Sequence, residues 1–98
     1  MEILKKKNDG NLLISLVGRL DTTTAPELEA ALNESLDGVT ELNLDFAKLE
    51  YVSSAGLRVL LGAQKKMNAQ GKMSLKNVSS DIMEVFEITG FSDILTIE

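Results

Sequence analysis

Two adjacent serine hydroxyls, those of Ser53 and Ser54, lie where a predicted strand gives way to a predicted helix. Residues 41–46 alternate apolar and polar side chains, the two-residue period of a half-buried strand. Residues 55–63 are almost entirely apolar and rich in leucine, which favours a helix over a second strand. A helix start accepts serine caps and negative charge, because its first N–H groups are unpaired and its dipole is positive there. A serine at this junction could carry a phosphate without disturbing the fold, so the sequence predicts a candidate switch.

Other serine chemistry has little support in the composition. The chain contains no cysteine and no histidine, so thiolate ligands, the commonest general base and a Ser-His-Asp arrangement are all missing. A serine hydrolase built on Ser54 is one reading of the same junction, but the Gly-x-Ser-x-Gly elbow and the glycine motifs of phosphate and dinucleotide sites are absent too. We therefore expect a protein that is not an enzyme and that holds no metal or cofactor.

The bulk composition describes a small acidic protein. Its 98 residues, 44% hydrophobic and 26% charged, are typical of one globular domain spanning residues 1–98. The net charge of -5 argues against nucleic acid and anionic membranes as partners. The N-terminus lacks a signal-peptide layout, and no apolar run approaches the length of a bilayer span. We expect a cytoplasmic protein that binds neither nucleic acid nor membrane.

The N-terminal segment predicts a hairpin. Strands are expected at residues 2–7 and 11–17, and Asp9-Gly10 between them is a strong signal for a tight turn. Residues 11–17 are nearly continuously apolar, which predicts a strand covered on both faces.

The remaining chain alternates helices and strands. Thr24 and Glu27 have the spacing of a capping box at the start of the first helix. Helices are predicted at 25–37, 54–70 and 80–89, and further strands at 41–46, 73–78 and, as a short last strand, 93–98. This order implies an α/β fold with a mixed, mostly parallel sheet of four to five strands and at least three helices. The expected core includes Leu44, Phe46, Leu60, Leu61 and Phe86.

Three stretches of the chain carry a resemblance to a known family: Val17-Gly18-Arg19-Leu20-Asp21, Thr24-Ala25-Pro26-Glu27-Leu28, and Tyr51-Val52-Ser53-Ser54-Ala55-Gly56-Leu57-Arg58-Val59-Leu60-Leu61. They resemble the anti-sigma factor antagonists, whose fold is called the STAS domain. The order and length of the predicted elements agree with that fold over essentially the whole chain.

The resemblance implies a bacterial cytoplasmic protein that binds an anti-sigma factor, which is often itself a serine kinase. Binding frees the sigma factor, phosphorylation of one serine abolishes the binding, and a serine phosphatase restores it. The alternative is a constitutive STAS interaction module in a larger signalling or transport complex, with Ser54 only a helix cap. The size and polar surface of the chain allow a monomer, which is the state we expect.

The family pattern also points to a phosphorylated residue. In the family, that serine commonly follows an aspartate and lies two residues before a glycine. This position falls on Ser54, with Ser53 in place of the aspartate and Ala55 just before Gly56. The resemblance therefore implies phosphorylation of Ser54, and Ser53 is the competing candidate.

The expected partner face joins the loop after the second strand to the start of the second helix, and comprises Asp21, Thr22, Thr23, Ser53, Ser54, Gly56 and Arg58. Three of these residues also have a structural reading. Asp21 could satisfy nearby N–H groups in a turn, and Gly56 could serve close packing as well as room for a partner. Arg58 lies on the same side of the helix as Ser54, where it could contact an acidic partner or a phosphate, or remain solvated.

Overall fold

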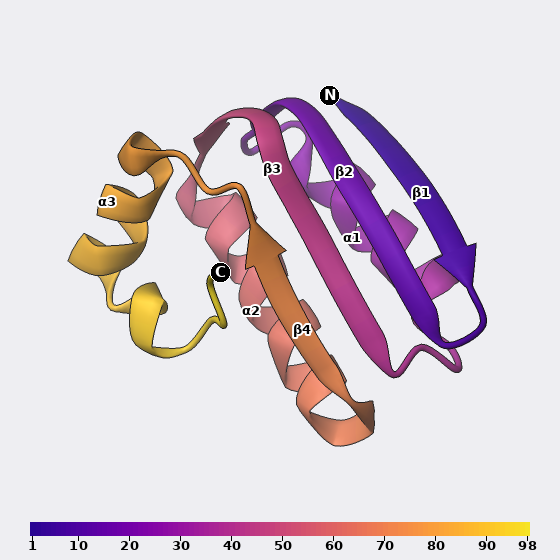
Figure 1. Cartoon of the computed structure of the whole chain (residues 1–98). Coiled ribbons are helices and arrows are strands. Elements are labelled where there is room, and N and C mark those ends of the chain that lie inside the picture. Colours follow the sequence, from indigo (N-terminus) through magenta and orange to yellow (C-terminus); the bar gives the residue numbers. More distant parts are fainter.

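The computed structural model describes all residues 1–98 and contains a four-stranded sheet with the order β1-β2-β3-β4 (Figure 1). The strands are β1 (Glu2–Asn8), β2 (Asn11–Leu20), β3 (Glu41–Val52) and β4 (Lys72–Lys76). β1 and β2 are antiparallel, whereas β3 runs parallel to both β2 and β4. The predicted mixed, mostly parallel sheet is confirmed.

The three α-helices are α1 (Ala25–Ser35), α2 (Ser54–Gln70) and α3 (Ser80–Thr89). α1 and α2 lie behind the sheet in Figure 1, and α3 lies beyond β4, on the side away from β1. The bounds of α2 and α3 agree with the prediction, whereas α1 is shorter because the chain leaves it at Leu36 and turns at Gly38, where φ is 77°. None of these helices combines the length and the apolar character that crossing a bilayer requires.

The first helix starts without the predicted capping box. Thr24 precedes α1 with a helical backbone (φ -95°, ψ -18°), and its side chain makes no capping hydrogen bond. Its hydroxyl instead donates to the carbonyl of Arg19 at 2.7 Å, because the turn folds back onto the end of β2. The capping-box prediction is therefore wrong.

The central strand β2 buries only one of its faces. Leu12, Ile14 and Leu16 of β2 are at most 2% exposed, whereas Leu13 between them is 38% exposed. The two helices that cross between parallel strands, α1 and α2, cover the same face (Figure 1). The prediction that residues 11–17 are covered on both faces is therefore wrong.

The core lies between the sheet and the helices and contains 24 buried residues. Leu44, Phe46, Leu60 and Phe86 belong to it, as predicted. Leu61 is only half-buried, because it follows Leu60 on α2 and points about 100° away from it around the helix. The rings of Phe46 and Phe86 are 6.5 Å apart and join α3 to β3.

The predicted last strand, residues 93–98, is reduced to a single bridge. The 3₁₀ helix η1 (Phe91–Asp93) occupies its beginning. Further on, Ile97 pairs with Leu75 in parallel, as the N–H of Leu75 donates to Thr96 at 2.8 Å and the N–H of Glu98 donates to Leu75 at 2.9 Å. The chain end thus lies beside β4 without extending the sheet by a full strand.

Candidate partner-binding site

The carboxyl ends of β2 and β3 bring two segments of the predicted partner face together at one end of the sheet (Figure 1). The loop at residues 21–24 follows β2, and Ser53 follows β3 directly. The N–H of Ser53 donates to the carbonyl of Leu20 at 2.8 Å, which joins the two segments at their base. The loop and the start of α2 therefore lie next to each other.

The two serines at the start of α2 have different environments. Ser53 is the N-cap, with an extended backbone (φ -88°, ψ 174°), and its Oγ accepts the N–H of Gly56 at 3.2 Å. Ser54 is the first residue of the helix, and its side chain is exposed. Since no hydrogen bond within the protein uses the Ser54 hydroxyl, its oxygen is free to react without breaking a contact.

The start of α2 also offers a favourable position for an anion. Helix geometry leaves the first N–H groups without intrahelical acceptors, and the helix dipole adds partial positive charge. Ser53 accepts one of these N–H groups, and no acidic residue lies in the first turn. A phosphate ester on Ser54 would therefore meet positive potential without a carboxylate of the same turn beside it.

Asp21 holds the loop before α1 in shape. Its Oδ1 accepts the N–H groups of Thr23 and Thr24, each at 3.0 Å. The hydrogen bond from the N–H of Thr24 is the largest cause that lowers the pKa of the Asp21 carboxyl below its usual value, and Arg19, 3.9 Å from Oδ2, adds to it. The turn role of Asp21 is thus present in the structure, while a contact with a partner stays a prediction.

Gly56 allows α2 to start close to the end of β2. A Cβ at this position would lie 2.7 Å from Cγ of Leu20, closer than real Cβ contacts allow, and 3.1 Å from the Leu20 carbonyl oxygen, which is tighter than most such contacts. Gly56 is itself buried. The structure therefore shows the packing role of Gly56, and its expected contact with a partner stays a prediction.

The remaining residues of the predicted partner face are open to solvent. Thr22, Thr23 and Arg58 are exposed, and Arg58 forms no ion pair within the protein. Their side chains carry groups that can donate hydrogen bonds.

Sequence reasoning missed a stacked pair beside this face. The guanidinium carbon of Arg19 lies 4.4 Å from the centre of the Tyr51 ring, at a distance typical of a cation–π contact. The two residues are partners in the pairing of β2 with β3, but only after two register shifts. A strict two-residue alternation could not align them, although Tyr51 is the only tyrosine in the chain and lies two residues before Ser53.

The profile of the STAS domain family matches residues 2–98. The chain belongs to the STAS domain family. This STAS chain is 38% identical to BtrV of Bordetella bronchiseptica over 99 residues, covering 99% of the chain and 85% of BtrV. It is 30% identical over 93 residues to the anti-sigma-B factor antagonist of Bacillus subtilis, covering 94% and 85% of the two chains.

Solved structures share the same STAS fold. The anti-sigma factor antagonist SpoIIAA in its unphosphorylated form matches with a TM-score of 0.78 at 22% identity, covering 99% of this chain and 87% of SpoIIAA. The phosphorylated form of SpoIIAA from Bacillus matches with a TM-score of 0.77 at 22% identity, covering 99% and 91%. At these identities the likeness establishes the fold, and the roles of individual residues are argued from this STAS chain itself.

Proposed function

We propose that this STAS protein is an anti-sigma factor antagonist whose binding is switched off by phosphorylation of Ser54. The observation that carries the proposal is the contrast between the two serines: Ser54 is exposed with a free hydroxyl, whereas the Ser53 oxygen caps the helix. The relative from Bacillus subtilis, which matches 94% of the chain, is an anti-sigma-B factor antagonist and supports the class of partner.

The energetics favour a switch that changes binding and leaves the fold intact. A phosphate adds a charge of about -1.5 to -2. At a helix start the dipole stabilises an anion by roughly 0.3–1 kcal/mol, so the folded state should survive the modification. Across an interface, juxtaposed like charge costs several kcal/mol, and about 3 kcal/mol would weaken binding roughly 100-fold.

The proposal assigns a binding role to the chain and the chemistry to its partners. An anti-sigma factor that is a serine kinase would transfer a phosphate to Ser54, and a serine phosphatase would remove it. The STAS protein itself contributes the partner face and the acceptor hydroxyl, acting in the cytoplasm as a non-enzymatic regulator.

The test uses each kinase-type anti-sigma factor encoded in the host genome, purified and titrated with the wild-type chain and with Ser54→Ala, Ser54→Asp and Ser53→Ala. With ATP present, mass spectrometry maps the phosphorylated residue. We expect Ser54→Ala to bind and to resist phosphorylation, because loss of the hydroxyl removes only the acceptor atom. Ser54→Asp should remain folded by circular dichroism and bind poorly.

Two outcomes would contradict the proposal. If phosphorylated chain binds as tightly as unmodified chain, the switch is wrong and a constitutive STAS interaction module becomes the better description. If Ser53→Ala blocks phosphorylation and Ser54→Ala does not, the modified residue has been placed one position too far along the chain.

A further inference from the structure

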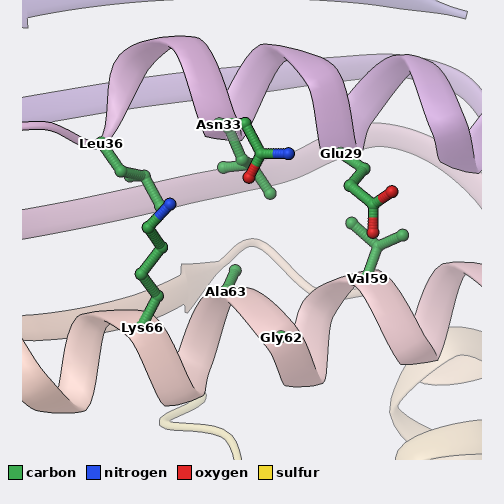
Figure 2. A pocket seen from close by; sticks show the side chains of 8 residues that line it. Glu29, Asn33, Leu36, Val59, Gly62, Ala63 and Lys66 are labelled. Atoms are coloured by element: carbon green, nitrogen blue, oxygen red, sulfur yellow. The ribbon is translucent and has the colours of Figure 1, made fainter.

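A groove runs between α1 and α2 on their outer side, with the sheet behind them (Figure 2). Its apolar lining comes from Leu32 of α1, from Leu36 directly after α1, and from Val59 and Ala63 of α2. Glu29, Asn33, Gly62 and Lys66 complete the lining, and the groove has a volume of about 130 Å³. An apolar cavity of about 150 Å³ is large enough for benzene. The groove is therefore of the size that takes one apolar side chain.

Gly62 keeps this groove open. A Cβ on Gly62 would meet no atom within 4 Å, and the residue lies in the interior of α2 with no left-handed backbone angle. Neither close packing nor the backbone conformation requires glycine here, in contrast to Gly56. Because glycine is a poor helix former, its presence lowers the stability of α2, and no contact within the chain compensates for this loss. What it provides is free space on the α2 side of the groove.

Opposite charges stand at the two ends of the groove. Figure 2 shows Glu29 pointing from α1 towards Val59, and Lys66 pointing from α2 towards Leu36. Neither Glu29 nor Lys66 forms an ion pair within the protein. A complementary ligand would therefore place a basic group near Glu29 and an acidic group near Lys66, with an apolar side chain between them.

The groove adjoins the partner face. Both helices start at that face, and the groove begins at Glu29 and Val59, four and five residues after Ala25 and Ser54. At 1.5 Å per residue this separation is about 6–8 Å along the helices. A standard interface of about 800 Å² per partner is on the order of 28 Å across, so a partner seated over Ser54 also reaches the groove.

On the basis of the proposed function, we propose that the anti-sigma factor inserts one apolar side chain, flanked by a basic and an acidic residue, into the groove between α1 and α2. The charge arrangement, the open space at Gly62 and the continuity with the partner face all favour this occupant. The groove then contributes to affinity at a place that phosphorylation of Ser54 does not alter.

The test measures stability and affinity together for Gly62→Ala and Gly62→Leu, using the purified anti-sigma factor that binds the wild-type chain. Gly62→Ala should raise the melting temperature by about 2–8 °C, because alanine is the better helix former, and should weaken binding several-fold. Gly62→Leu fills the groove and should weaken binding at least about tenfold. The control is Ala69→Leu, which adds bulk to an exposed position of α2 outside the groove and should keep wild-type affinity.

The outcomes separate this inference from the proposed function. If Gly62→Leu binds like wild type while Ser54→Asp does not, the groove inference is wrong and the antagonist role stands. An equal loss with Ala69→Leu and Gly62→Leu would also overturn the groove, because the effect would not be local to it. If the wild-type chain binds no kinase-type anti-sigma factor of its host, both proposals fail.

Discussion

The same substitution, glycine to alanine, should have opposite effects on stability at two positions of α2. Gly56 lies in the first turn and is packed against Leu20, whereas Gly62 lies six residues further on, about 1.7 turns, with free space around it. Each change adds one methyl group and the same gain in helix propensity. The two variants therefore serve as matched controls for each other.

The magnitude follows from what the new methyl group meets. At Gly56 it would lie 2.7 Å from Cγ of Leu20, a residue that is 0% exposed and whose carbonyl accepts the N–H of Ser53. Since neither atom of Leu20 can shift easily, we take the upper part of the overpacking range, about 2–3 kcal/mol. Alanine recovers about 0.5–1 kcal/mol of propensity, which leaves a destabilisation of about 1–2.5 kcal/mol. At Gly62 only the gain remains, about 0.5–1 kcal/mol.

Urea unfolding followed by far-UV circular dichroism measures both variants. We expect their free energies of unfolding to differ by about 2–3 kcal/mol, because the equal propensity gain cancels and only the overpacking cost at Gly56 remains. The difference should appear as a separation of the midpoints with unchanged m-values. If Gly56→Ala raised the midpoint as much as Gly62→Ala does, the close approach of α2 to Leu20 would not constrain the chain, and the packing role of Gly56 would be refuted.

Two further predictions concern stability. Ser53→Ala removes the acceptor of the Gly56 N–H and should lower the free energy of unfolding by about 0.5–2 kcal/mol in urea titrations. The phosphorylated residue should stay the same. An unchanged free energy of unfolding would contradict the capping role of Ser53. The pKa of the Asp45 carboxyl is lowered mainly by a hydrogen bond from the Asn77 side chain and further by one from the N–H of Ala47. The Asp45 carboxylate therefore stabilises the fold at pH values above its unfolded pKa of about 3.9. This stabilisation is lost as the pH falls through the lower pKa of the folded state. Asp45→Asn should therefore flatten the loss of stability below about pH 4 in urea titrations, and an unchanged acid slope would assign that loss to other groups.

The elements with local start and stop signals could be predicted from the sequence. α2 begins after a serine that can cap it and ends before Gly71, and both signals act over a few residues. The length of β3 could not be predicted, because its pairing with β2 shifts register twice beyond Ser15 and the two-residue alternation ends there. The exposed outer face of β2 was missed for a different reason: Leu13 is apolar although solvent reaches it, so composition alone does not reveal which faces are covered.

The candidate site shows the same division between local and long-range information. That a serine stands at the start of α2 is visible from spacing, but Ser53 and Ser54 are equally good caps as residue types. Which of them caps the helix depends on where the backbone changes from extended to helical. The hydrogen bond from the N–H of Ser53 to the carbonyl of Leu20, a residue distant in the sequence, fixes that point. The stacking of Arg19 on Tyr51 is likewise a product of strand pairing and has no local signal.

The unbonded hydroxyl of Ser54 has a kinetic consequence. A phosphate attached there would break no hydrogen bond of the chain, so the modified and unmodified proteins would share one conformation and no refolding step would separate them. The response time of such a switch would then depend only on the turnover of the kinase and phosphatase and on the dissociation rate of the complex. Any dependence of the response on earlier signals would come from the amounts of kinase and phosphatase, and the STAS domain itself would show no hysteresis.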